Sequence, residues 1–150
     1  MRRAPPKLVL DTQLFINAFR DVAAKQALQR FHDLFAPFEQ MSSIVAQELR
    51  AGVTSADDKR SLERHVLSHF ERTGRTITPS AAAWLRSGDV LAGMATEEGL
   101  ELAKVSKSFA NDILLALSCR ESGCILITEN VRDFSRIRRF IPFDFVPPWP

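Results

Sequence analysis

The chain has 150 residues, of which 45% are hydrophobic and 25% charged, with 20 Lys and Arg against 18 Asp and Glu. These proportions exclude a disordered chain and a collagen-like repeat. The net charge of +2 excludes a strong global field that would attract nucleic acid or a membrane surface. We therefore expect a single globular domain spanning residues 1–150.

The cysteines and the N-terminal segment indicate the cellular compartment. Cys119 and Cys124 are the two cysteines, too few for a disulfide framework or for a four-cysteine zinc site. The apolar stretch after Pro6 ends at Asp11, which is too short for a signal peptide. No apolar run reaches the roughly 20 residues of a membrane helix. We expect a cytoplasmic protein with no membrane partner.

Short apolar runs alternate with segments of helical spacing along the chain. The first run, at 7–11, lacks the alternation of a half-exposed strand, which is typical of a parallel strand covered on both faces. Further strands are expected at 39–42, 76–78, 124–128 and 143–146. Helices are expected at 14–19, 22–35, 43–50, 57–73, 80–98, 109–122 and 131–139, with 100–108 irregular. This alternation predicts an α/β protein with a mainly parallel sheet.

Polar residues follow the two most apolar predicted strands. Asp11 stands at the carboxyl end of the first, and Thr128, Glu129 and Asn130 stand at the same end of the strand at 124–128. Ligands of open parallel sheets bind beyond the carboxyl ends of strands, where the strand order reverses. The competing interpretation of Asp11 is an N-cap for the helix that follows.

Two further carboxylates lie on apolar helix faces. Glu48 shares a face with Ile44 and Val45, and Asp112 lies in the first turn of its predicted helix on the same face as Leu115. The competing interpretations are an exposed glutamate at the edge of the stripe and a charge that caps the helix. Three carboxylates from separate segments, each at an inner position, favour a hard divalent cation.

Four segments, in order, resemble a known family. They read Leu-Val-Leu-Asp-Thr at 8–12, Ser-Ile-Val-Ala-Gln-Glu-Leu-Arg-Ala-Gly at 43–52, Asn-Asp-Ile-Leu-Leu-Ala-Leu at 111–117 and Ile-Thr-Glu-Asn-Val-Arg-Asp-Phe at 127–134. The chain resembles the PIN-domain ribonucleases, in particular the VapC-type toxins of type II toxin–antitoxin systems. The resemblance implies a three-layer α/β/α PIN-like fold with a central, mainly parallel sheet.

The resemblance also implies a site. It assigns metal binding and catalysis, with Mg²⁺ or Mn²⁺ as the cofactor, to Asp11, Glu48, Asp112 and Asp133. Many family members have aspartate at the position of Asn130, so the fourth position stays open between Asn130 and Asp133. Thr128 is expected to orient water or phosphate. The expected substrate-binding residues are Thr12, Asn130, Arg132 and Arg136.

The function implied is metal-dependent hydrolysis of RNA phosphodiester bonds by the toxin of a toxin–antitoxin pair. A cognate antitoxin protein and a homodimer are the expected partners. The first alternative is a catalytically inert PIN-like module that binds RNA or a partner. The basic residues after Asn130 could attract the substrate, and the competing interpretation of them is a solvated helix face. A receiver-type signalling module is the second, but Glu48 and Asp112 lie on predicted helices.

Three other sequence features do not match a known catalytic or metal-binding motif. Gly88 and Gly93 have P-loop spacing, but the Lys and the Ser or Thr of that motif are missing. His65 and His69 lie four residues apart without the glutamate of a zinc-protease motif, so we do not expect them to bind metal. The two cysteines are expected to be small core residues.

Overall fold

Five short strands form one sheet in the order β3-β2-β1-β4-β5, and each neighbouring pair is parallel. The computed structural model describes residues 5–150. The strands are β1 (Lys7–Leu10), β2 (Glu39–Ser42), β3 (Thr76–Ile77), β4 (Cys124–Ile127) and β5 (Asp144–Val146). The α/β class and the parallel sheet predicted from the sequence are confirmed.

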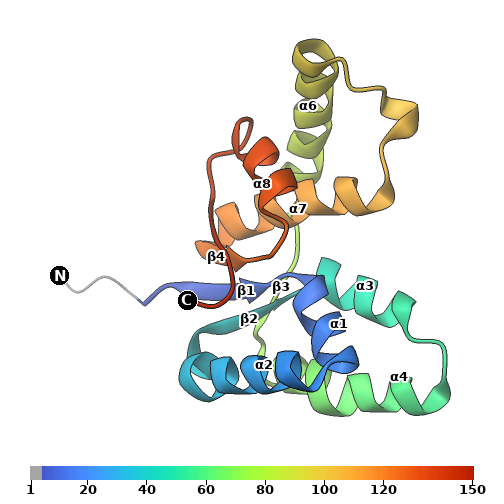
Figure 1. Cartoon of the computed structure of the whole chain (residues 1–150). Helices are drawn as coiled ribbons and strands as arrows, with labels where there is room; N and C mark the ends of the chain where they lie inside the picture. The colour runs from blue at the N-terminus through green and yellow to red at the C-terminus, as the bar shows by residue number, and fades with distance from the viewer. Residues whose placement is uncertain (1–4) are drawn as a thin grey trace.

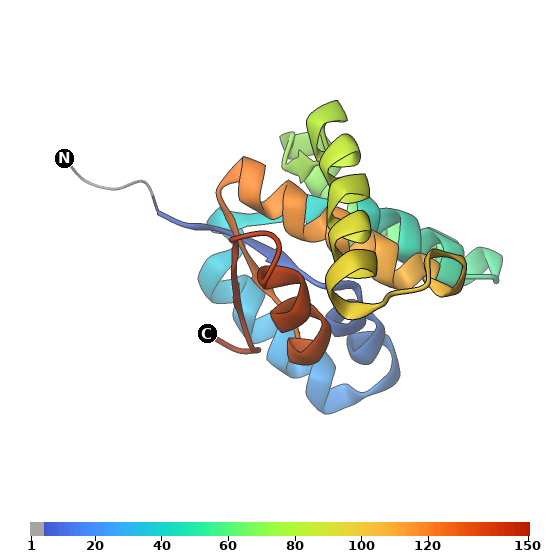
Figure 2. The same ribbon diagram turned by 90° about the horizontal axis from the view of Figure 1, so that it is seen from above.

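Helices cover both faces of this sheet. The layer below it in Figure 1 contains α1–α4, and the opposite layer contains α6–α8, which face the viewer in Figure 2. The helical elements are α1 (Thr12–Arg20), α2 (Val22–Phe35), η1 (Ala36–Phe38), α3 (Ser43–Gly52), α4 (Ala56–Leu62), η2 (Glu63–Leu67), α5 (Ser68–Thr73), α6 (Ala81–Glu98), η3 (Leu102–Lys104), α7 (Lys107–Ser122) and α8 (Val131–Arg138). Among the helices of residues 5–150, none combines the length and the apolar character needed to cross a bilayer.

The segment predicted as one helix at 57–73 is instead α4, a π-helical turn (η2) and α5. Leu62 and Leu67, five residues apart, are both almost fully buried. In a regular α-helix that spacing would place them on different faces, whereas a π turn brings residues five apart close to one face. The requirement to bury both leucines therefore accounts for the interruption.

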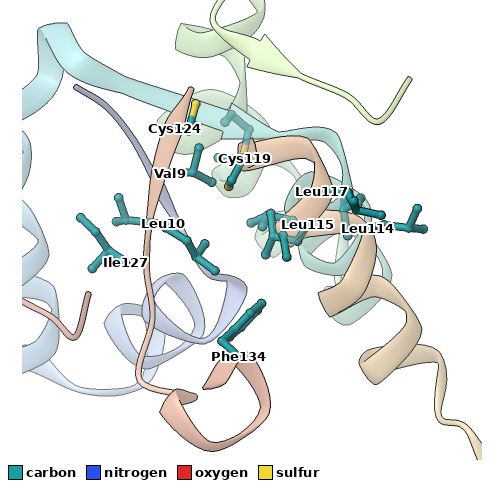
Figure 3. Close-up of a cluster of buried hydrophobic side chains, with 14 of the residues drawn as sticks. Val9, Leu10, Leu114, Leu115, Leu117, Cys119, Cys124, Ile127 and Phe134 are labelled. Carbon is teal, nitrogen blue, oxygen red and sulfur yellow. The ribbon is translucent and has the colours of Figure 1, made fainter. Parts of the chain in front are cut away.

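The core lies around β1, β4 and α7. Val9, Leu126 and Ile127 are completely buried in the two central strands, and α7 is buried from Asp112 to Cys119. Figure 3 shows the side chains of these strands packed beside those of α7 and Phe134. Both cysteines are free and buried within this cluster, so their predicted role as core residues is confirmed.

The topology fixes where a ligand site can form. From β1 the chain passes to β2 and β3 on one side, and then returns to β4 on the other side of β1. The carboxyl ends of β1 and β4 are therefore the switch point of the sheet. The backbone N–H of Asp11 donates to the carbonyl of Ile127 at 3.0 Å, which joins the two strand ends directly.

Candidate metal centre

Asp11 occupies the switch point and is only 7% exposed. Its Oδ1 accepts a hydrogen bond from the backbone N–H of Thr12 at 2.8 Å, and its Oδ2 accepts one from the hydroxyl of Thr128 at 2.6 Å. The first contact makes Asp11 the N-cap of α1, so the capping interpretation and the site interpretation hold together. Thr128 is completely buried directly after β4. The ends of both central strands thus hold this carboxylate in one orientation.

Glu48 joins the same site from α3. The hydroxyl of Thr12 donates to Glu48 Oε1 at 2.7 Å. Glu48 is half-buried and meets Thr12, so it is not an exposed residue at the edge of the apolar stripe. Thr12 therefore connects the two carboxylates, because its backbone N–H donates to Asp11 and its hydroxyl donates to Glu48.

Asp112 and Asp133 approach from α7 and α8, on the opposite layer. Asn130 Nδ2 lies 3.5 Å from Asp112 Oδ2 and 3.1 Å from Asp133 Oδ2. Asn130 also caps α8, because its Oδ1 accepts from the N–H of Asp133 at 3.4 Å. Both candidates for the fourth position therefore lie in one network, in which Asn130 is the helix cap and its side-chain amide donates to the Asp133 carboxylate beside Asp112.

The position of Asp112 in its helix differs from the prediction. The hydroxyl of Ser106 accepts from the N–H of Phe109 at 3.0 Å, so α7 begins at Lys107. Asp112 therefore lies in the second turn and not in the first, and the segment at 100–108 contains η3 and the first residues of α7. A charge that caps the helix acts within its first turn, so capping does not explain this carboxylate.

Burial and repulsion both act on Asp112. Its side chain is 7% exposed, and its pKa is raised from 3.8 to about 8. Desolvation is the largest cause, and the negative charges of Asp11, Glu48 and Asp133 add to it. The charges of the other three predicted acids therefore all act on Asp112, although the four acids come from different segments of the chain.

Asp11 responds to a fifth acid that sequence reasoning left without a role. Burial raises the pKa of Asp11, and the charges of Glu48 and Glu129 raise it further, against its two hydrogen bonds. Glu129 is exposed and accepts from Asn17 Nδ2 at 3.2 Å, and Gln13 Nε2 in turn donates to Asn17 Oδ1 at 2.8 Å. Gln13 is thus linked to Glu129 through Asn17. No short-range sequence signal links residues 17 and 129.

The donor set fits a hard divalent cation. Carboxylate, amide and hydroxyl oxygens are the ligands that Mg²⁺ and Mn²⁺ prefer, and a cation would relieve the repulsion that raises the pKa of Asp112. In residues 5–150, no three acidic, His or Cys side chains already converge on a shared ion position. The fit therefore rests on the chemistry of the donors and on their mutual charge.

Comparison with known proteins identifies the fold and the family. The sequence model of the PIN domain matches residues 8–140. The chain belongs to the PIN-domain family. The family predicted from the four sequence motifs is thereby confirmed, and so is the three-layer α/β/α fold.

Solved structures agree with this fold. Similar chains occur in DNA-bound VapBC from Salmonella typhimurium (TM-score 0.70, 22% identity), FitAcB from Neisseria gonorrhoeae (0.67, 19%) and a toxin–antitoxin complex from Klebsiella pneumoniae (0.62, 24%). Each similarity covers 95% of this chain and 98% of the other. No curated protein matches this PIN domain by sequence.

The arginines of this PIN domain have unequal environments. Arg132 is exposed on α8, as a phosphate-binding residue requires. Arg136 instead donates from Nε to Glu98 Oε2 at 2.6 Å, and its guanidinium lies 5.0 Å from the centre of the Phe109 ring. Arg138 lies over the ring of Phe145 at 4.5 Å. Arg136, which was predicted to bind the substrate, is therefore engaged within the protein by Glu98 and Phe109.

A cavity of the PIN domain lies apart from the acids. It has a volume of about 860 Å³ and lies between α1, α2 and α5, and none of the four predicted acids lines it. His32, His65 and His69 line it together with the buried Glu39, whose Oε1 lies 2.5 Å from His32 Nδ1. These side chains form no metal-binding cluster within the part of the chain that the structure describes.

Proposed function

We propose that this PIN domain is a metal-dependent endoribonuclease that hydrolyses RNA phosphodiester bonds. The observation that supports this proposal most strongly is the environment of Asp112, a buried carboxyl whose pKa is raised to about 8 by burial and by three neighbouring acids. The charged form of such a carboxyl is unfavourable in the folded protein, and a bound cation would offset that cost. Perturbed carboxyls at the switch point of a parallel sheet are also typical of functional sites.

The four acids would hold Mg²⁺ or Mn²⁺ between the two helical layers: Asp11, Glu48, Asp112 and Asp133. When bound, the metal supplies an activated water and neutralises the charge that develops on the phosphate oxygens. The hydroxyl of Thr128 donates to Asp11 and that of Thr12 donates to Glu48, so these two threonines fix the orientation of the carboxylates. Asn130 has the same role for Asp112 and Asp133.

RNA would reach the acids across the surface of α8. Arg132 is exposed one residue before Asp133, and Lys107 is exposed at the start of α7. Contacts of this kind bind phosphates and neutralise the substrate without reading its sequence. Such contacts account for affinity, whereas the choice of RNA target depends on features beyond these charges.

We further propose that the chain is the toxin of a VapC-type toxin–antitoxin pair, is cytoplasmic and forms a homodimer. The motifs at 8–12, 43–52, 111–117 and 127–134 support this proposal. The similar structures, which include VapBC and a toxin–antitoxin complex, share its fold over 95% of this chain. Co-purification with the product of an adjacent gene would test the antitoxin partner. The mass of the complex in solution would test the homodimer.

The decisive experiment is cleavage of a labelled RNA by the wild-type chain and by Asp112→Asn, with and without Mn²⁺. We expect cleavage by the wild type only when Mn²⁺ is present, and none by the variant. Asp144→Asn is the matched control, since Asp144 is an exposed acid at the amino end of β5, on the opposite edge of the sheet. RNA binding without any product from the wild type would instead favour the inert binding module.

A further inference from the structure

Arg136 connects three helices one turn away from the acids. Its Nε donates to Glu98, the last residue of α6, at 2.6 Å, and its guanidinium lies over the ring of Phe109 on α7. Glu98 is 17% exposed and Arg136 is 35% exposed, so the pair is shielded from solvent on much of its surface. A guanidinium within about 6 Å of a ring centre is attracted to the ring face. Arg136 thus holds α8 against both α6 and α7.

Phe109 on α7 and Arg136 on α8 lie on the same helix faces as the acids Asp112 and Asp133. Phe109 precedes Asp112 by three residues on α7, and Arg136 follows Asp133 by three residues on α8. Residues three apart share a helix face. The two helices are therefore joined at two levels, through Asn130 beside the acids and through Arg136 and Phe109 one turn further out.

We propose that Arg136 is a positioning residue that sets the separation of Asp112 and Asp133 for the metal. The inference rests on the proposed function, since it concerns the acids assigned there to the cation. The carboxylates of Asp112 and Asp133 lie on different helices and are linked beside the site by Asn130, at 3.5 and 3.1 Å. The contacts of Arg136 with Glu98 and Phe109 hold α8 to α6 and α7 one turn away, and so limit how far the two acids can separate.

This geometry favours positioning over phosphate binding. The Nε donor of Arg136 is used by Glu98, one face of its guanidinium is covered by Phe109, and the adjacent carboxylate of Glu98 repels an approaching phosphate. Arg132 on the same helix is exposed, and no ion pair involves it within residues 5–150. The phosphate contact predicted for both arginines therefore suits Arg132, whereas Arg136 acts on the carboxylates.

The test measures Mn²⁺ binding by calorimetric titration in Arg136→Lys and Phe109→Leu. Lysine keeps the charge but loses the flat guanidinium and the Nε donor, and leucine keeps apolar bulk but loses the ring. We expect both variants to bind Mn²⁺ about tenfold more weakly, the size typical of groups that orient metal ligands. Their melting temperatures without metal should stay close to that of the wild type, and their KM for RNA should be unchanged.

Two arginines on α8 serve as matched controls. Arg139→Gln removes the second and longer contact to Glu98, at 3.4 Å, from a side chain that contacts no ring. Arg132→Gln removes an exposed charge. Both should retain wild-type Mn²⁺ affinity, and Arg132→Gln should bind RNA more weakly.

The outcomes separate this inference from the proposed function. Mn²⁺ binding that is equal in the wild type and in both variants overturns the positioning role alone, whether or not the melting temperature falls. A third outcome would assign Arg136 to binding the RNA phosphates. In that case Mn²⁺ affinity stays unchanged, while the KM for RNA rises in Arg136→Gln and returns to the wild-type value in Arg136→Lys. A wild-type chain that binds no Mn²⁺ overturns the proposed function, and with it the basis of the inference.

Discussion

The two halves of the acidic site are built differently. In the sheet half, Asp11 follows a central strand, and its carboxylate accepts hydrogen bonds of 2.6 and 2.8 Å from Thr128 and Thr12. In the helix half, Asp112 has one contact, to Asn130 at the longer distance of 3.5 Å, and its pKa rises to about 8. The sheet half therefore has its carboxylate fixed in advance, while the helix half has a buried acid with little hydrogen-bond support.

The two halves differ in how each carboxylate offsets the cost of its burial. Hydrogen bonds to the charged form stabilise the Asp11 carboxylate, so they partly offset its burial. Asp112 has a single and longer hydrogen bond, to Asn130, so either protonation or a nearby positive charge must offset its burial and the three neighbouring acids. We expect metal to change the helix half more than the sheet half, and the following predictions test that expectation.

The largest effect is expected from Asp11→Asn. The variant loses a carboxylate that is already oriented, and no other acid replaces it at the end of β1. Turnover of RNA should fall roughly 10³-fold, or about 4 kcal/mol of transition-state stabilisation, and excess Mn²⁺ should not restore it. Single-turnover cleavage over a range of Mn²⁺ concentrations measures this effect. Recovery at high Mn²⁺ would show that the two halves do not differ in this way.

A smaller and metal-dependent effect is expected from Asp133→Asn. Turnover should fall about 10²-fold, on the order of 3 kcal/mol, because Asp133 brings a full charge to the helix half. High Mn²⁺ should recover part of the activity. Asn130→Asp should be tolerated and should tighten Mn²⁺ binding, since it adds a carboxylate beside Asp112 and Asp133. Full activity and unchanged Mn²⁺ affinity in Asp133→Asn would leave a site of three acids.

The stability of Asp112→Asn should depend on pH. The pKa of Asp112 is raised from 3.8 to about 8 in the folded chain, so the wild type loses stability as pH rises between these values. Without metal, Asp112→Asn should be more stable than the wild type, by on the order of 2 kcal/mol at pH 8 and by progressively less toward pH 4. Urea denaturation across this range measures the difference. With millimolar Mn²⁺ the order should reverse, because the ion stabilises only a chain that binds it.

The smallest of the four effects is expected from Thr128→Val. Valine has nearly the shape of threonine but removes the donor to Asp11 and the acceptor for the N–H of Asn130, a contact of 3.0 Å. We expect a loss of about 1–2 kcal/mol in the free energy of unfolding. The pKa of Asp11 should rise further, because the lost hydrogen bond lowers it. An unchanged free energy of unfolding would indicate that the strand ends alone hold the carboxylate.

Most of the fold could be predicted from local pattern. The strand at 39–42 and the helix at 22–35 have the predicted bounds, and for the helix apolar periodicity and Pro37 determine them locally. The bounds of α7 could not be predicted in the same way. Ser106 and Ser108 are both able to cap a helix, and packing decides between them. The π turn of η2 depends on burying Leu62 and Leu67 together, which is also a tertiary requirement.

The candidate site was predictable only as far as its residue types. Asp11 and Thr128 follow apolar strands, so topology brings them together, and the motifs add Glu48 and Asp112. The engagement of Arg136 by Glu98 and Phe109 could not be predicted, because these partners lie 38 and 27 residues away in sequence. A charge run in sequence does not distinguish an arginine that faces solvent from one that is bound by its neighbours.

The strand order also determines when the site forms during synthesis. Asp11 and Glu48 leave the ribosome early. Thr128, however, follows β4, the neighbour of β1 that lies near the end of the chain. Because chains are made from the N-terminus onward, Asp11 has no hydrogen-bond partner from β4 until most of the protein has been translated. A nascent or truncated chain that ends before β4 therefore lacks Asp133 together with Thr128 and Asn130, which orient the other acids. Such a chain exposes β1 as an unpaired edge, a target for proteolysis and aggregation instead of a source of premature activity.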